Sequence, residues 1–127
     1  MLGSAKITTT IPSTNIKRAR EFFEGKLGLK VVDESENGIS FQAGGGTTLY
    51  AYKRGPGKAD HTLASFEVPD LEAKVDEMSK NGIVFEQYDF PGLKTNEKGI
   101  ATMEDEGEKA AWFKDPDGNI LALGEKI

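Results

Sequence analysis

Three side chains that can bind cations stand close together near the end of the sequence. Asp115, Asp117 and Asn119 alternate in the stretch DPDGN, as the first, third and fifth positions of a calcium loop do. Such a loop also needs glycine at its sixth position and glutamate at its twelfth, but Ile120 and Lys126 stand there. The proline and glycine of the stretch favour a tight turn instead. We therefore interpret it as a turn between strands.

His61 is the only histidine of the chain, and histidine is the side chain best suited to exchange a proton near neutral pH. It opens the alternating stretch HTLASFEV, in which His61 and Glu67 fall on the same face of a predicted strand. These two residues are the candidate catalytic residues. The simpler interpretation of His61 is a hydrogen-bonded residue at the end of a strand.

Composition excludes several classes of protein. The chain has no cysteine, which excludes thiol catalysis, disulfides and zinc–thiolate sites. Its net charge of −5 argues against nucleic acid and anionic membrane surfaces, which bind basic proteins. No segment is apolar over the length of a membrane span, and MLGSAK lacks a signal-peptide core. We therefore expect a cytoplasmic protein with no nucleic-acid or membrane partner.

The hydrophobic pattern predicts the same order of elements twice. A strand, a helix and further strands occur in each half, separated by a glycine- and proline-rich linker. Asn15 and Asp70 are the predicted helix N-caps. The predicted strands span residues 6–11, 29–34, 39–43, 47–53, 61–68, 83–88, 100–105, 109–115 and 119–125, and the helices follow the two caps.

Fixed offsets relate the two halves. Asn15 and Asp70 lie 55 positions apart (70 − 15), and the turn residues Gly46 and Gly118 lie 72 apart (118 − 46). The longer loop at 91–99 absorbs most of the difference. The chain therefore reads as two copies of one βαβββ module. We expect a single domain, 1–127, with module one at about 5–54, a linker at about 55–60 and module two at about 61–127.

Nearly all of the chain resembles the vicinal oxygen chelate superfamily, the glyoxalase, bleomycin-resistance and extradiol-dioxygenase proteins. The resemblance is carried by NIKRAREFFEGKLGLKV, FEVPDLEAKVDEMSKNGIVF and WFKDPDGNILAL. It implies an α+β fold in which two βαβββ modules form curled mixed sheets around a shared cleft, with helices on the convex side. It also implies a homodimer and, in the metal enzymes of the family, a divalent ion held by two residues from each module.

The positions that hold the metal in those relatives are occupied here by other residue types. They correspond to Thr8, Tyr50, Leu63 and Ala122, none of which is a histidine, glutamine or carboxylate. A divalent ion needs several oxygen or imidazole ligands that converge on it. We therefore expect no metal and no other cofactor.

Without a metal, the predicted cleft is lined by aromatic, small and hydroxyl-bearing side chains, a lining that suits an apolar or planar small molecule. The alternative is that these side chains fill a closed core. The acidic stretch Glu104–Glu108 is interpreted as a solvated hairpin tip. The candidate ligand-binding residues are Thr8, Phe41, Tyr50, Tyr52, His61, Leu63, Ser65, Tyr88, Met103, Trp112 and Ala122.

Two functions remain open on the sequence. The first is a metal-independent protein of the glyoxalase and bleomycin-resistance type that binds an apolar or aromatic ligand as a homodimer. The second is a glyoxalase- or isomerase-like lyase that uses a displaced metal site around His61, or an acid–base pair of His61 with Glu67 or a tyrosine. A weaker third hypothesis is a regulatory module that binds another protein.

Overall fold

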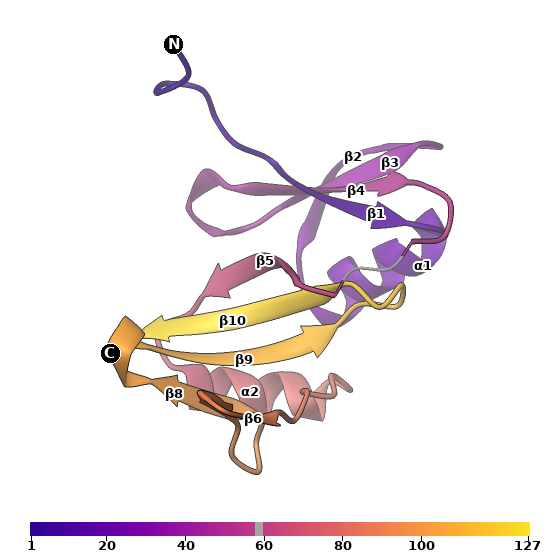
Figure 1. Ribbon diagram of the computed structural model, residues 1–127. Coiled ribbons are helices and arrows are strands. Elements are labelled where there is room, and N and C mark those ends of the chain that lie inside the picture. Colours follow the sequence, from indigo (N-terminus) through magenta and orange to yellow (C-terminus); the bar gives the residue numbers. More distant parts are fainter. Residues whose placement is uncertain (58–59) are drawn as a thin grey trace. The chain divides into compact units, whose positions relative to one another are not determined.

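The computed structural model describes residues 1–57 and 60–127 and divides the chain into two units, Met1–Gly57 (unit 1) and Lys58–Ile127 (unit 2). The division falls in the predicted linker at 55–60, of which residues 58 and 59 lie outside the described residues. Each unit has a four-stranded mixed sheet with a helix in contact with one of its faces (Figure 1). The predicted α+β class and the two modules are confirmed, whereas their union in one domain stays a prediction.

Unit 1 is built around a sheet whose strand order is β1-β4-β3-β2. β1 is parallel to β4, and the other pairs are antiparallel. The core lies between the sheet and the helix and includes Ile11, Ile39, Phe41 and Leu49, each at most 3% exposed. The elements are β1 (Thr9–Ser13), α1 (Ile16–Arg20), η1 (Glu21–Lys26), β2 (Lys30–Ser35), β3 (Gly38–Gln42), η2 (Gly44–Gly46) and β4 (Thr48–Lys53).

Unit 2 repeats this topology with the order β5-β10-β9-β8, and β5 is parallel to β10. A two-stranded hairpin, β6-β7, is inserted in the chain between α2 and β8. Leu71, Val75, Phe113 and Leu121 form the centre of its core. The elements are β5 (Thr62–Glu67), α2 (Leu71–Lys80), β6 (Asp89–Phe90), β7 (Leu93–Lys94), β8 (Ile100–Met103), η3 (Glu104–Glu106), β9 (Glu108–Lys114) and β10 (Ile120–Lys126). Among the described residues, no helix is long and apolar enough to cross a membrane.

Both predicted helix N-caps are confirmed. The Asn15 side chain accepts a hydrogen bond from the Arg18 amide at 3.0 Å, and the Asp70 side chain accepts one from the Ala73 amide at 3.2 Å. Each bond satisfies a donor that the first turn of a helix leaves unpaired. The two modules therefore begin their helices in the same way.

The first helix continues from α1 into a wider π turn, η1. The Leu27 amide donates to the carbonyl of Phe22, five residues back, at 3.0 Å. Phe22 and Phe23 are both buried, with ring centroids 5.2 Å apart in an edge-on arrangement. The extra residue in the π turn allows both of them to face the sheet.

Two predicted strands differ from those observed. The first strand begins at Thr9, not at residue 6. In the register with β4, in which Thr9 pairs with Leu49, residues 6 and 7 have no strand opposite them because β4 begins at Thr48. Ile7, which precedes the observed strand, is 89% exposed. The segment 83–88 makes only an isolated bridge between Phe85 and Phe113. Its chain then turns into the β6-β7 hairpin, which the Thr95 amide closes by donating to the Tyr88 carbonyl at 3.0 Å.

Glu125 ties the last strand to the second helix. Its Oε1 accepts a hydrogen bond from the amide of Leu71, the first residue of α2, at 2.6 Å. Leu71 is fully buried, and a carboxylate at this end of a helix also interacts favourably with the helix dipole. Glu125 therefore stabilises the docking of α2 on β10.

We predict that Glu125→Ala lowers the free energy of unfolding of unit 2 by about 1–2 kcal/mol, because the Leu71 amide loses its acceptor. Glu125→Gln keeps an acceptor and should cost about half as much. Urea denaturation followed by the fluorescence of Trp112, the only tryptophan, measures this effect in unit 2. Glu106→Ala, at an exposed site in η3, is the matched control. Equal effects of the Glu125 and Glu106 changes would contradict the capping role.

Candidate functional site

The face of each sheet opposite its helix is called here the helix-free face. The alternation along the paired strands decides which side chains lie on it. The eleven candidate ligand-binding residues are divided between the units, with four in unit 1 and seven in unit 2. Each set is described within its own unit.

In unit 1 the helix-free face carries a stacked pair of tyrosines. The rings of Tyr50 and Tyr52 lie 6.3 Å apart and are inclined by only 15°. Gly38 makes this possible, because a Cβ there would lie 2.4 Å from the hydroxyl of Tyr50. The Thr8 hydroxyl lies 3.2 Å from the Thr48 hydroxyl on the same face. The predicted orientations of Thr8, Tyr50 and Tyr52 agree with this arrangement.

Phe41 does not belong with these residues. Its side chain is fully buried, and its ring lies 5.5 Å from the ring of Phe23 in the first helix. In the register of the sheet it pairs with Leu49, whereas Tyr50 pairs with Ser40. Phe41 therefore faces the helix, and its place among the ligand-facing residues is corrected to a place in the core.

In unit 2 the helix-free face has a floor of small side chains. Trp112, Ala122 and Ser65 form one row across β9, β10 and β5. Ala101, Ala110, Gly124 and Glu67 form the next row across β8, β9, β10 and β5. Met103 pairs with Glu108 beyond that row. The expected positions of Ser65, Met103, Trp112 and Ala122 opposite the helix fit this register.

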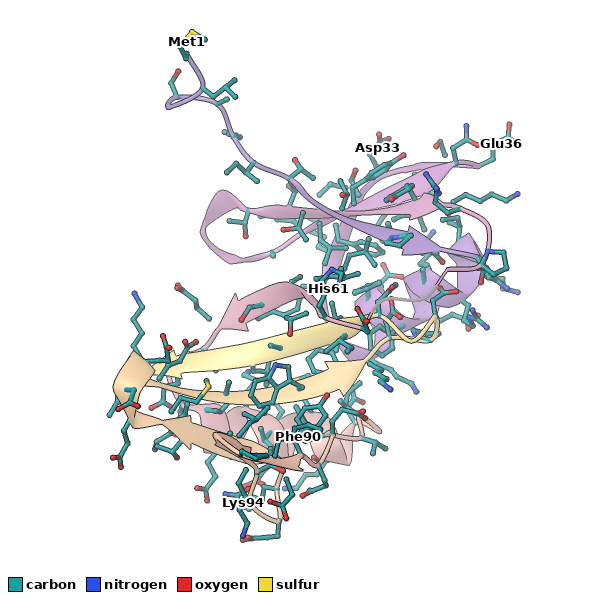
Figure 2. All side chains as sticks on the ribbon, in the orientation of Figure 1. Met1, Asp33, Glu36, His61, Phe90 and Lys94 are labelled. Atoms are coloured by element: carbon teal, nitrogen blue, oxygen red, sulfur yellow. The ribbon has the colours of Figure 1, made fainter. Side chains whose placement is uncertain are left out.

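An aromatic cluster forms one end of this floor. The Tyr88 ring lies 5.6 Å from that of Trp112, edge-on, and 5.8 Å from that of Phe90, stacked. Phe90, in the β6-β7 hairpin (Figure 2), is 59% exposed. Burial raises the pKa of Tyr88, and the nearby Glu86 carboxylate adds to this rise. Sequence reasoning missed Phe90 because the hairpin that carries it was read as a loop.

The proposed catalytic pair is not brought together. His61 lies just before β5 (Figure 2) with its side chain 71% exposed, and its Nδ1 lies 3.4 Å from the carboxylate of Asp60. Glu67 lies at the other end of β5. Five residues of extended strand separate the ends of β5 by about 17 Å. His61 and Glu67 are therefore too far apart to exchange a proton directly.

The residues at the family's metal positions do not fit a divalent ion. Leu63 and Ala122 have no donor atom, and the ring of Tyr50 is held against Gly38 and Tyr52. Within residues 1–57 and 60–127 no three histidine, cysteine or acidic side chains are grouped so that they could hold a metal. No buried side-chain donor or acceptor in this part of the chain lacks a hydrogen-bond partner. We therefore derive no chemistry through a metal at these positions.

The acidic stretch at 104–108 is only partly a solvated tip. Glu104, Asp105 and Glu106 are exposed in η3, but Glu108 is half-buried in β9. A Cβ on Gly124 would lie 2.4 Å from Oε1 of Glu108, so the carboxylate lies directly over β10. The alternation of Glu108, Ala110 and Trp112 was the signal that could have placed Glu108 on this face. The interpretation of Glu108 as fully solvated was wrong.

The DPDGN stretch is a turn stabilised from within. Oδ1 of Asp115 accepts the amides of Asp117 and Asn119, each at 2.9 Å, and Oδ2 accepts the Asn119 side-chain amide at 2.8 Å. Asp115 is only 7% exposed. Its oxygens are therefore occupied by donors of the turn, as the turn interpretation requires.

These features accompany a clear family match. The model of the Glyoxalase/Bleomycin resistance protein/Dioxygenase superfamily matches residues 7–123. The chain belongs to this superfamily. No curated protein sequence matches the chain.

Several solved structures share its fold. A glyoxalase family protein from Enterococcus faecalis has a TM-score of 0.73 at 22% identity, covering 98% of this chain and 100% of that one. A lactoylglutathione lyase from Agrobacterium tumefaciens has a TM-score of 0.65 at 21% identity, covering 96% and 93%. An antibiotic binding protein from a Streptomyces species has a TM-score of 0.68 at 18% identity, covering 100% and 99%. At these identities the likeness establishes the fold alone.

The burial of Asp115 makes its contribution to stability depend on pH. Burial raises its pKa and a minor contribution comes from Asp117, while the hydrogen bonds of the turn oppose the rise without cancelling it. A raised pKa in the folded state means that folding favours the protonated carboxyl. The stability that Asp115 contributes is therefore complete below the ordinary aspartate pKa and decreases as the pH rises through the raised value.

We predict that Asp115→Asn, which cannot ionise, destabilises unit 2 most at about pH 3, and that this penalty shrinks toward about pH 7. Asp115→Ala also removes the acceptors of the turn and should cost about 2–3 kcal/mol. Urea titrations at several pH values, followed by Trp112 fluorescence, give both quantities. A penalty for Asp115→Asn that grows with pH would contradict the raised pKa.

Proposed function

We propose that this protein binds an apolar or aromatic small molecule on the helix-free faces of its sheets and that it needs no metal ion to do so. The ligand-facing residues of the proposal are those of the two faces, without Phe41. They are Thr8, Tyr50 and Tyr52 in unit 1 and Leu63, Ser65, Tyr88, Met103, Trp112 and Ala122 in unit 2, with His61 at the edge of the second set.

The observation that carries the proposal is the aromatic cluster of Trp112, Tyr88 and Phe90 beside a floor of small side chains. Aromatic rings at the margin of a sheet face offer a ligand both buried area and stacking geometry. Trp112 is half-buried, so part of its ring surface is available to a ligand. A planar or apolar molecule fits such a surface.

The stacked tyrosines of unit 1 support the same class of ligand. Tyr50 and Tyr52 are both half-buried and present two nearly parallel rings on one face. Because Gly38 has no side chain, the ring of Tyr50 can lie against the sheet at this point. An aromatic surface that is held in place loses little conformational entropy when a ligand binds.

Metal independence is supported by the side chains at the four family positions, Thr8, Tyr50, Leu63 and Ala122. Two of them are hydrocarbon, and the other two are neutral hydroxyls. The lyase alternative would need His61 as part of a displaced site. That residue is 71% exposed, and the ion pair that it makes is with the exposed carboxylate of Asp60. The binding function is therefore preferred over the enzymatic one.

We predict that planar aromatic compounds quench Trp112 fluorescence in a saturable way and that calorimetry gives the same dissociation constant. Trp112→Leu should weaken this binding about tenfold or more, because a buried aromatic contact contributes about 1.5 kcal/mol or more. Trp112→Phe keeps a ring and should lose less. Val84→Ala, at a side chain that is 79% exposed, is the control.

Elemental analysis of protein purified without chelator tests whether binding is independent of a metal. Less than stoichiometric zinc, nickel, manganese and iron is expected, and binding of the aromatic compounds should be unchanged by chelator treatment. A stoichiometric metal that disappears in His61→Ala would overturn the metal-independent proposal in favour of the lyase. Failure of all aromatic compounds to bind would overturn the binding proposal itself.

We further propose that the protein is a cytoplasmic homodimer. The exposed apolar side chains of Ile7 and Val32 provide surface that a second copy can cover. Sedimentation equilibrium at micromolar concentration should therefore give twice the 13.8 kDa mass of the chain. A single-chain mass at all concentrations would contradict the dimer.

A further inference from the structure

Glu108 occupies an unusual place for a carboxylate. It is half-buried on the helix-free face of unit 2, on the same side of β9 as Ala110 and Trp112. Its register partner in β10 is Lys126, but its carboxylate lies over the neighbouring Gly124. The missing Cβ of Gly124 creates the space, because a Cβ there would lie 2.4 Å from Oε1 of Glu108. Gly124 thus positions Glu108.

A cavity of about 390 Å³ opens beside this carboxylate. All its lining residues belong to unit 2, and the ends of β5, β9 and β10 provide most of them. Within residues 1–57 and 60–127 the Glu108 carboxylate makes no hydrogen bond or ion pair, although Lys126 lines the same cavity. The lining residues are Glu67, Val68, Pro69, Glu108, Gly124, Glu125 and Lys126.

Ser65 connects this cavity to the aromatic cluster. Its Oγ lies 3.7 Å from the same position above Gly124, and it shares a row with Ala122 and Trp112. Glu108 and Trp112 are four residues apart in β9, which corresponds to about 13 Å along the strand. The side chains of Ala110 and Ala122, each 5% exposed, lie between them. An elongated molecule can span this separation between the rings and the carboxylate.

On the basis of the proposed function, we infer that Glu108 recognises a positive charge on the ligand, which is an apolar or aromatic molecule carrying a protonated amine. A half-buried carboxylate without a partner gains most from a cation, since charge-assisted hydrogen bonds are the strong ones. Glu67 lines the same cavity and adds a second negative charge. Trp112 and Tyr88 bind the apolar end, and Glu108 selects the charge at the other end.

Three probes of matched length test this inference, namely phenylhexylamine, phenylhexanol and phenylhexanoic acid. Calorimetry on the full chain at neutral pH should show the amine binding about tenfold more tightly than the alcohol, and the acid more weakly than either. Glu108→Gln should reduce the affinity for the amine to that for the alcohol and leave the affinity for the alcohol unchanged. Glu104→Gln, an equal change of charge at an exposed site in η3, should have no effect.

Gly124→Ala provides a second variant, because it displaces the carboxylate without removing its charge. It should reduce the preference for the amine over the alcohol, with the emission spectrum of Trp112 confirming that unit 2 remains folded. Equal affinities for amine and alcohol in the unmodified protein, both weakened by Trp112→Leu, would overturn the role of Glu108 and leave the proposed function intact. Absence of binding by all three probes would overturn both.

Discussion

The parallel pairing of the first strand with the last strand is the constraint on which each unit depends. It joins β1 to β4 and β5 to β10, so that the residues farthest apart within a module become neighbours in its sheet. The helix that follows the first strand must then cross to the strands beyond it, and it contacts one face only. This arrangement therefore leaves each sheet with one face that a helix covers and one face without a helix.

The helix-bearing faces of both units are filled by large apolar side chains. Phe23 and Phe41 meet in unit 1, and Phe85 and Phe113 meet in unit 2 with ring centroids 5.7 Å apart. The π turn of the first helix is part of this packing, since it brings two consecutive phenylalanines to one side. These contacts stabilise the modules and leave the opposite faces free to carry a binding site.

The helix-free faces differ between the units although the strands have the same order. Unit 1 has two stacked tyrosines over Gly38, whereas unit 2 has a floor of small residues with rings at one end and Glu108 toward the other. In both units a glycine makes room for a side chain from a neighbouring strand. The same device thus positions an aromatic ring in one module and a carboxylate in the other.

The sequence by itself determined the module order, the two helix caps and the orientation of most strand residues. Each of these depends on local periodicity or on a side chain that bonds to its own neighbourhood, as Asn15 and Asp70 do. The sequence also determined that Leu63 and Ala122 cannot bind a metal, because residue chemistry does not depend on the fold. Its errors at residues 6–8 and 83–88 occurred where pairing depends on the extent of a distant strand.

Only the tertiary structure decided the roles of Phe41, Glu108 and Glu125. Phe41 is buried because β3 pairs with β4 in a register that turns its ring toward the first helix. Glu125 caps α2 although it lies 54 positions away from Leu71 in the chain. Glu108 lies over Gly124 because β9 and β10 pair there. Contacts between segments that are distant in the sequence produce no periodic pattern, so the sequence alone could not predict them.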